Sequence, residues 1–364
     1  MNEKEIKDAL APLQPFLDDT TVVEIMVDGF DKVYVERQGE QGQYEDIPSP
    51  FRDNRHLLDV IHKTAVALDH KLGEGEFMMD VRLPDGARFN VVLPPIAILG
   101  PSLVIRKFSA RQLTVEDLIR YGSINQMLVD FLQMCINGRL NIVISGGTNS
   151  GKTSLLNIVT GLIPPNERIV TVENAAELRP PKALKRIVRL ESQPGNASGK
   201  GIVTMRDLVT NAMRMRADRI IVGEIRSGEA LNILSAMNTG HEGSMFAIHA
   251  NSPRDALARL ETMVYLAMSS QPLLQVRQQM ASALDLIVQA ERLRDGSRKV
   301  VRVSEAAGMQ GDVIMVRDIF KFEETEEING RIQGTLAATG YIPTFVKKMH
   351  MLGITVPMDM FNKA

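Results

Sequence analysis

The chain contains no tryptophan and only one cysteine, Cys135. A single cysteine cannot form a disulfide within the chain, so a reducing compartment is the simpler expectation. Aromatic residues make up 5% of the sequence, which leaves few side chains on which the bases of single-stranded nucleic acid could stack. Neither sign of charge predominates, because 42 Lys and Arg are matched by 44 Asp and Glu. This balance excludes a polybasic protein that coats nucleic acid.

Long hydrophobic runs are also absent. No segment approaches the roughly 18 consecutive apolar residues that a membrane-spanning helix needs, and the charged start of the chain, Met1–Lys7, lacks the apolar core of a signal peptide. We therefore expect any role at a membrane to be peripheral. The chain does have the composition of a globular protein, with 44% hydrophobic residues, and its 364 residues predict two domains.

The first 110 residues are predicted to form a small mixed α/β domain. Short β-rich runs are separated by turn signals such as Pro84-Asp85-Gly86, which is typical of hairpins. One longer segment has apolar residues at helical spacing and ends before Gly73. The expected elements are strands at 22–27, 33–37, 79–83, 87–93 and 103–108, and a helix at 54–72.

Residues 111–364 show a different rhythm, in which helices and strands alternate. Such alternation predicts a mostly parallel sheet covered by helices. The expected strands are 141–145, 168–172, 187–190, 220–222 and 244–249, and the expected helices are 125–137, 152–160, 207–216, 228–238 and a long one capped by Ser252 and Pro253. The tail is predicted to contain strands at 286–289, 299–304 and 313–322, a hairpin turn at Asn329-Gly330 and a helix at 343–352. A mobile loop is expected at 192–201.

The sharpest motif is the phosphate-binding loop pattern G-x-x-x-x-G-K-[ST], which runs from Gly146 to Thr153. Its glycines allow backbone N–H groups to turn onto phosphate oxygens, and the helix that follows adds its positive end. We expect Lys152 to reach the β- and γ-phosphates of a nucleotide and the Thr153 hydroxyl to ligate Mg²⁺. The alternative is a glycine-rich turn that only caps a helix. The residues expected to hold the nucleotide are Gly147, Thr148, Asn149, Ser150, Gly151, Lys152, Thr153 and Ser154.

An acid that could hold the metal from across the sheet follows the apolar run 219–222. Many phosphate-loop proteins place an aspartate directly after this strand, whereas here Gly223 precedes Glu224. We expect Glu224 to hold Mg²⁺ together with Thr153. The alternative is that Glu224 forms an ordinary ion pair with Arg226.

A further acid, Glu173, ends the β-rich run 168–172. If this strand lies beside the phosphate loop, Glu173 could polarise the water that attacks the γ-phosphate. Carboxylates at strand ends also serve as ordinary acids at helix N-termini, so this alternative stays open.

Two histidines, His241 and His249, bracket a short predicted strand. From their spacing alone, either could be a polar residue at a strand end. No cysteine or further histidine lies close enough in the sequence to suggest a zinc site. Metal ligation by these histidines is therefore not expected.

With these motifs in order, the chain resembles the secretion ATPases of bacterial type II and type IV systems. The resemblance is strongest to the branch that powers tight-adherence (Flp-type) pili, which is close to the VirB-type conjugation ATPases. Two positions depart from the family pattern. Asn174 stands where an acid usually follows Glu173, and Ala217 stands where the family commonly has proline. The segments that carry the resemblance are the phosphate loop, an "Asp box" at 171–178, Gly223-Glu224, a "His box" at 241–249, and the N-terminal segments 22–29, 33–37, 82–88 and 105–108.

The resemblance implies a two-domain protomer with a RecA-like C-terminal ATPase domain, assembled into a homo-hexameric ring. Such a ring hydrolyses ATP with Mg²⁺ and moves an inner-membrane platform protein during pilus assembly or protein secretion. By position, Glu173 would activate water, Glu224 would hold Mg²⁺, and His249 together with His241 would sense the γ-phosphate. The family's N-terminal and linker arginines match Arg82, Arg88 and Arg106.

At least some of these three arginines should reach phosphates, whether in their own subunit or in a neighbour. From the sequence alone they would be solvated charges on strands. Two other classes of protein also stay open. One is a DNA-translocating RecA-like ring whose lumen gathers Arg214, Arg216 and Arg219, and the other is a nucleotide-binding switch without turnover.

Overall fold

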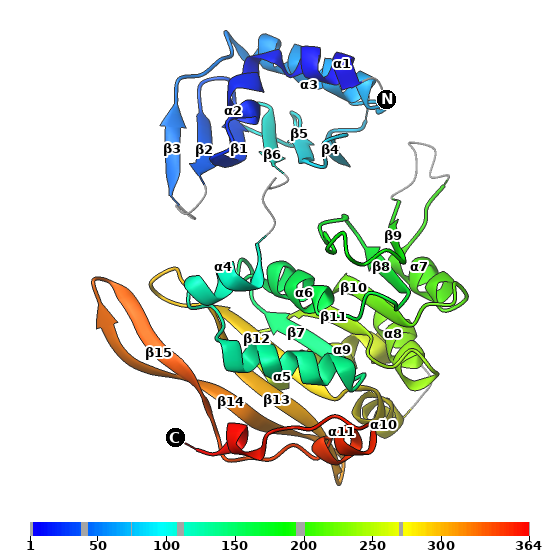
Figure 1. The fold of residues 1–364 in the computed structure, drawn as a ribbon. Coiled ribbons are helices and arrows are strands. Elements are labelled where there is room, and N and C mark those ends of the chain that lie inside the picture. Colours follow the sequence, from blue (N-terminus) through cyan, green and yellow to red (C-terminus); the bar gives the residue numbers. More distant parts are fainter. Residues whose placement is uncertain are drawn as a thin grey trace. The chain divides into compact units, whose positions relative to one another are not determined.

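The computed structural model describes residues 3–37, 43–73, 75–107, 113–193, 201–268 and 272–363. The chain divides into two compact units, one containing the described residues up to 107 and the other those at 113–193 and 203–363 (Figure 1). The predicted domain boundary between residues 110 and 111 lies outside the described residues, as does most of the loop predicted at 192–201. Each unit is described by itself.

The N-terminal unit is an antiparallel sheet packed against helices. Its six described strands follow the order β3-β2-β1-β6-β5-β4, and alternate residues such as Ile25, Val35 and Phe89 pack on Leu57 and Ile61 of the long helix. The elements are α1 (Glu3–Ala9), α2 (Gln14–Asp18), β1 (Val22–Asp28), β2 (Val33–Arg37), β3 (Tyr44–Ile47), α3 (Asn54–Ala67), β4 (Met78–Arg82), β5 (Arg88–Val92) and β6 (Ser102–Arg106).

Both predicted hairpins of this unit are confirmed, since β1 pairs with β2 and β4 with β5 in antiparallel register. The predicted helix at 54–72 is too long. It ends at Ala67, and Asp69 follows with a left-handed φ of 60° that no α-helix continues through. Helix α1 and strand β3 were not predicted.

The C-terminal unit confirms the predicted α/β class. Within the described residues its sheet has nine strands in the order β15-β14-β13-β12-β7-β11-β10-β8-β9. The six strands from β12 to β9 are parallel, and the three beyond β12 are antiparallel. The strands are β7 (Ile142–Gly146), β8 (Ile169–Glu173), β9 (Ile187–Glu191), β10 (Arg219–Ile225), β11 (Met245–His249), β12 (Leu286–Arg292), β13 (Arg298–Gln310), β14 (Val313–Ile328) and β15 (Arg331–Ala338).

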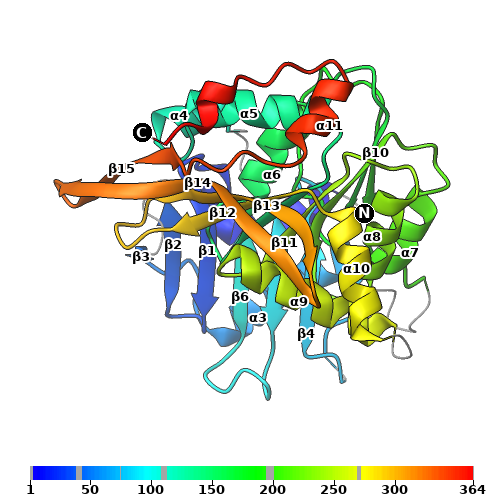
Figure 2. The ribbon, with the colours of Figure 1, turned by 90° about the horizontal axis from the view of Figure 1, so that it is seen from below.

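Helices cover both faces of this sheet (Figure 2). One hydrophobic cluster joins one face to α5, α6 and α11, and a second joins the opposite face to α7–α10. The helices are α4 (Val115–Arg120), α5 (Gln126–Asn137), α6 (Lys152–Gly161), α7 (Met205–Ala212), α8 (Glu229–Asn238), α9 (Pro253–Ala267), α10 (Leu273–Ala283) and α11 (Val346–Met351). Within the residues that the structure describes, no helix is both long and apolar enough to cross a lipid bilayer.

Side-chain caps fix where several of these helices begin. Asn125 and Ser252 accept N–H groups from the first turns of α5 and α9, as their sequences predict. Helix α7 begins two residues earlier than predicted, because Thr204 and Asp207 form a capping box. It also ends earlier, at Ala212, and Arg216 beyond it has a left-handed φ of 54°.

Candidate active site

The phosphate-binding loop lies between the end of β7 and the start of α6. Gly146, the last residue of β7, pairs with His249 of β11 on one side and with Ala290 of β12 on the other. Because these strands are parallel, their carboxyl ends lie at the same edge of the sheet. Ligands of open α/β sheets bind outside this edge.

The backbone of the loop forms a cradle that side chains would fill. A β carbon at Gly146 would lie 2.4 Å from both the carbonyl oxygen of Ala290 and the hydroxyl of Ser150. Asn149 and Gly151 have left-handed φ values of 58° and 91°, so the chain turns back on itself before α6 begins. The N–H groups of the first turn of α6 are directed at the same place. These features fit a bound phosphate group.

Lys152 begins α6 and folds over the loop. Its Nζ donates to the carbonyl oxygen of Gly147 at 2.8 Å and lies 4.0 Å from Oε1 of Glu224. Burial lowers the pKa of Lys152, Glu224 opposes this change, and the charges of Arg226 and Arg259 add to it. The ammonium group is therefore short of negative partners, which favours the binding of an anion beside it.

Glu224 is the second-to-last residue of β10, and its carboxylate faces two cations. Its Oε2 accepts from Nε and Nη2 of Arg226 at 2.9 and 2.5 Å, while Oε1 faces Lys152. The ion pair with Arg226 that the sequence left open therefore exists. It does not remove Glu224 from the loop, because Arg226 is 66% exposed and free to be displaced into water, whereas Lys152 is nearly buried.

Glu173 is the buried carboxylate of the site. It ends β8, is 2% exposed, and its Oε2 accepts the backbone N–H groups of Glu177 and Leu178, both at 2.7 Å. Its Oε1 is buried and has no hydrogen-bond partner among the described residues. Burial raises the pKa of Glu173 to about 7, against the smaller opposing effect of these N–H groups. No described helix starts here, so the reading of Glu173 as an acid at a helix N-terminus is wrong.

The glycine before Glu224 is explained by Glu173. A β carbon at Gly223 would lie 3.0 Å from Cγ of Glu173 and 3.5 Å from its Oε2. Strands β8 and β10 are neighbours in parallel register, so the two carboxylates come from adjacent strands. The missing side chain at 223 leaves the room in which Glu173 lies.

If Glu173 activates water as the resemblance implies, Gly223→Ala is expected to lower the rate of ATP hydrolysis by about tenfold. Glu173 would have to move by a few tenths of an ångström, and misplacement of a reacting group is costly. Steady-state phosphate release measures this, and nucleotide affinity should stay within a factor of two or so. Gly228→Ala is the matched control, since its β carbon would make an ordinary 3.5 Å contact with Ala267. Equal rates for Gly223→Ala and Gly228→Ala would contradict the role given to the space that the missing side chain at 223 leaves for Glu173.

His249 lies at the carboxyl end of β11, beside the loop. Burial, together with the charges of Lys152 and Arg259, lowers the pKa of His249. The imidazole is therefore neutral at physiological pH, and a neutral ring can donate one hydrogen bond and accept another. The structure thus brings Lys152, Glu173, Glu224 and His249 to one edge of the sheet.

The family model described as type II/IV secretion system protein matches residues 6–328. The chain belongs to this family. It is 34% identical over 316 residues to the conjugal transfer protein TrbB of Rhizobium radiobacter, covering 86% of this chain and 92% of that protein. It is 29% identical over 333 residues to the type IV secretion system protein VirB11 of Bartonella quintana, covering 81% of this chain and 91% of that protein.

Solved structures show the same fold. The chain superposes on the pilus retraction motor PilT with bound ADP at a TM-score of 0.54, with 18% identity, covering 82% of this chain and 81% of that one. Family membership, the phosphate-binding loop and the carboxylates that face it identify the chain as an ATPase of the type II/IV secretion family. Nucleotide use and the fold expected from the resemblance are thereby confirmed.

His241 of this secretion ATPase lies away from the phosphate loop. It precedes β11, at the amino end of the strand whose carboxyl end carries His249. The strand rises about 3.3 Å per residue, so the length of β11 separates the two rings. The expectation that both histidines meet the same phosphate within one subunit is therefore not supported, and only His249 lies beside Lys152.

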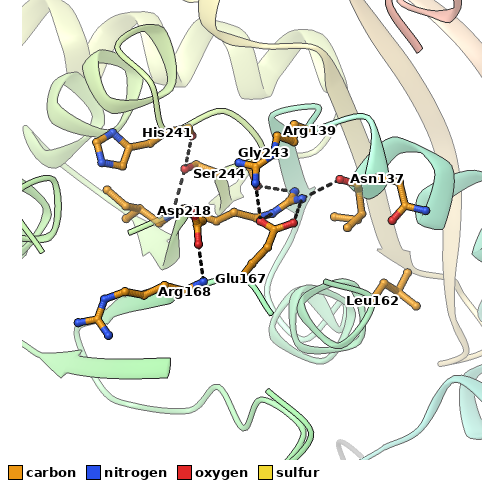
Figure 3. A network of polar contacts seen from close by, with 12 residues as sticks. Asn137, Arg139, Leu162, Glu167, Arg168, Asp218, His241, Gly243 and Ser244 are labelled. Atoms are coloured by element: carbon orange, nitrogen blue, oxygen red, sulfur yellow. Dashed lines mark hydrogen bonds and ion pairs between the residues drawn. The ribbon is translucent and has the colours of Figure 1, made fainter. Parts of the chain in front are cut away.

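A polar network occupies the edge where His241 lies (Figure 3). At its centre, Arg219 donates from Nε and Nη2 to the two carboxylate oxygens of Glu167 at 2.8 and 2.9 Å. The same guanidinium donates to the carbonyl oxygens of Ile136 and Gly243 at 2.8 and 3.2 Å. A β carbon at Gly243 would lie 2.3 Å from Nη1 of Arg219, so only glycine fits there.

This network corrects the idea that Arg219 lines a ring lumen. The side chain is fully buried and has bonds to four acceptor atoms in its own subunit. A guanidinium held in this way is not available to nucleic acid. Of the three arginines considered for that purpose, only Arg214 and Arg216 are exposed.

One arginine that the sequence did not single out contacts the phosphate loop directly. Nε of Arg298, the first residue of β13, donates to the carbonyl oxygen of Asn149 at 2.7 Å. It therefore stabilises the left-handed conformation of Asn149 and adds positive charge to the loop. Arg298 lies 149 residues from Asn149, and no local pattern connects the two.

The three N-terminal arginines lie side by side in the other unit. Arg82 pairs with Arg88 across β4 and β5, and Arg88 pairs with Arg106 across β5 and β6. Directly opposed residues of an antiparallel sheet share a face, and like charges in this position are destabilising. Asp80 binds Arg88, and Glu24 lies opposite Arg106. Arg82, Arg88 and Arg106 together form an arginine row, which makes this end of the N-terminal sheet electropositive.

Proposed function

We propose that this ATPase is the hexameric motor of a bacterial secretion or pilus system. It uses ATP hydrolysis to move platform proteins of the inner membrane, and those partners hold it at that membrane. The observation that carries the proposal is the meeting of Lys152, Glu173, Glu224 and His249 outside one edge of the sheet, around a backbone cradle shaped for phosphate.

The donor set fits ATP with Mg²⁺. Thr153 in the first turn of α6 and Glu224 opposite Lys152 supply the hydroxyl and carboxylate oxygens that Mg²⁺ prefers. Bound Mg²⁺ and ATP supply the reactive anhydride and the cation that offsets its charge. Lys152 and the N–H groups of the loop hold the phosphates and stabilise the negative charge that develops during transfer.

Glu173 is the proposed acceptor of the proton of the attacking water. One oxygen, Oε2, is fixed by two backbone N–H groups, which leaves Oε1 to accept the proton. The raised pKa of Glu173 brings its basicity near that suited to proton transfer at neutral pH. Neutral His249, at the end of β11, donates a hydrogen bond to the γ-phosphate.

The arginine row gives a route from hydrolysis to motion. We propose that at least some of Arg82, Arg88 and Arg106 contact the phosphates of a nucleotide held in the same or a neighbouring subunit. Bound ATP then draws an N-terminal unit towards a C-terminal unit, and hydrolysis releases it. Sequential closure around a ring would do mechanical work on the attached platform protein.

The test is phosphate release by the purified full chain with Mg²⁺. We expect the rate per subunit to rise with protein concentration as rings assemble, and Lys152→Ala to abolish it. A chain that binds ATP but releases no phosphate at any concentration would be the non-hydrolysing switch. Stimulation by single-stranded DNA would favour the DNA-translocating ring, which the buried Arg219 no longer supports.

The arginine row has its own expected outcome. An arginine finger contributes on the order of 10³-fold or more to the rate where it operates. At least one of Arg82→Ala, Arg88→Ala and Arg106→Ala should therefore reduce hydrolysis strongly at concentrations where rings form. Three rates equal to that of the unchanged chain would contradict domain closure while leaving the ATPase site intact.

A further inference from the structure

A second basic site lies in the C-terminal unit, where α9 begins. A cavity of about 540 Å³ is lined by Arg254 of α9, Arg302 of β13 and Arg317 of β14, together with Ser252, Asp318 and Tyr341. The three arginines come from α9 and from the β13–β14 hairpin, which lies about fifty residues further along the chain. None of them belongs to the phosphate loop or to the carboxylates that face it.

The charges that line this cavity are not balanced. Three guanidinium groups are accompanied by one carboxylate, Asp318, which leaves a net charge of +2 (three minus one). Asp318 already accepts from Ser304 at 2.7 Å and from Arg302 at 3.4 Å. Within the described part of the chain, the side chains of Arg254 and Arg317 have no hydrogen bond or ion pair.

A nearby acid does not supply the missing negative charge. Glu305 pairs with Arg317 across β13 and β14, but it is 2% exposed and does not line the cavity. Its oxygens accept from the hydroxyl of Tyr341 at 2.6 Å and from the hydroxyl and N–H of Thr344 at 2.5 and 3.0 Å. The carboxylate is therefore committed to holding Tyr341 and the start of the last helix.

We propose that this cavity binds a ligand that carries phosphate groups, at a site separate from that of the hydrolysed nucleotide. Guanidinium groups match the geometry of phosphate with paired N–H donors, which an ammonium group cannot do. The volume lies in the range of pockets that enclose small molecules and exceeds what a single inorganic anion requires. The start of α9 adds the positive end of a 15-residue helix.

The cavity and the phosphate loop have no residue in common. The hydrophobic residues of α9 pack on the face opposite to the one that α6 covers. The proposed site therefore does not depend on the motor function. Two sources of phosphate fit the same chemistry, a free polyphosphate compound and the headgroup of an anionic phospholipid.

The first arm of the test measures binding of tripolyphosphate to the full chain by calorimetry at physiological salt. The Lys152→Ala background weakens binding at the phosphate loop. In this background, Arg254→Gln combined with Arg317→Gln should weaken binding by tenfold or more for each arginine that contacts phosphate. The matched control is Arg206→Gln with Arg214→Gln, which removes two exposed charges of the same unit outside the cavity and should leave affinity unchanged.

The second arm measures flotation with vesicles that contain phosphatidylglycerol, against vesicles of phosphatidylcholine alone. Loss of tripolyphosphate binding in the cavity variant supports a free phosphate compound. Loss of vesicle binding in that variant, but not in its control, supports a lipid headgroup. If Arg254 and Arg317 affect neither ligand, or if the control variant loses as much, the proposal is overturned. Since both arginines are exposed, unfolding of the variants is not expected, and circular dichroism checks it.

Discussion

Glu173→Gln is expected to reduce ATP hydrolysis by about 10²- to 10⁴-fold, the usual contribution of a general base. Glutamine has the same shape, and its carbonyl oxygen can still accept the N–H groups of Glu177 and Leu178 that now bind Oε2. The fold of the loop at 174–178 should therefore persist. The variant loses Oε1 as a proton acceptor, because the amide nitrogen of glutamine replaces this oxygen.

Measurements of binding and turnover separate this role from a structural one. The affinity for a non-hydrolysable ATP analogue should stay within a few-fold of that of the unchanged chain, while kcat falls. Glu177→Gln is the control, because it makes the same chemical change on an exposed residue four positions away, and it should change kcat by less than a factor of two or so. If Glu173→Gln retained full turnover, Glu173 would not be the base.

The same carboxyl group sets an expected pH dependence. Burial raises the pKa of Glu173 to about 7, and only the ionised form accepts a proton. Turnover should therefore increase as the pH rises from 6 through about 7 and then level off. The profile of Glu173→Gln should lack this step, and stopped assays in a series of buffers at constant ionic strength measure it. A step of equal size in both proteins would assign the titration to another group.

The second large effect is expected at Arg219, in the network at the other edge of the sheet. Arg219→Met should lower the free energy of unfolding of the C-terminal unit by about 3–5 kcal/mol. The methionine fills much of the same volume but leaves Glu167, which is 7% exposed, with only the more distant Arg139 at 3.3 Å. It also removes one hydrogen bond from each of the carbonyl oxygens of Ile136 and Gly243.

Urea unfolding of the full chain tests this, with hydrogen exchange in β10 reporting on the C-terminal unit. Arg277→Met is the matched control, because Arg277 and Glu261 form a similar pair at 2.6 Å that is about one quarter exposed. Its cost should be about 1 kcal/mol or less. Replacing Glu167 with glutamine in the Arg219→Met protein should recover part of the loss, since the buried charge is then removed. Equal losses of unfolding free energy in Arg219→Met and Arg277→Met would contradict the claim that burial makes the Arg219 pair the more costly one to break.

Local sequence patterns predicted the elements that are determined locally. The cap at Ser252 marked the start of α9, and the turn at Asn329-Gly330 joins β14 to β15 as expected. The phosphate loop was recognisable because its function requires glycines, a lysine and a hydroxyl at fixed spacing. Glu224 was recognisable because it follows an apolar strand. Nothing in the sequence, however, explains why Gly223 precedes it.

Long-range contacts decide what the sequence could not predict. Gly223 is explained only by Glu173, fifty residues away along the chain and one strand away in the sheet. Arg298 reaches the phosphate loop only because β13 follows β12 back across the sheet. The family resemblance grouped His241 with His249, yet strand β11 separates them and carries its two ends to opposite edges of the sheet. Helix α10 was not predicted, and β13 and β14 extend beyond the strands predicted at 299–304 and 313–322.

Strand β10 is anchored at one end and carries Glu224, the proposed metal ligand, near the other. Arg219 ties its first residue to three separate segments, whereas Glu224 has only a salt bridge to an exposed side chain and a lysine at 4.0 Å. If Mg²⁺ and nucleotide pull on Glu224 as proposed, we expect the anchored end of β10 to resist movement, and residues 226–228 and α8 to shift instead. Amide exchange at 226–228 should then respond to nucleotide more than at 219–222. The direction of the power stroke would be set by a lever pivoting at the buried arginine.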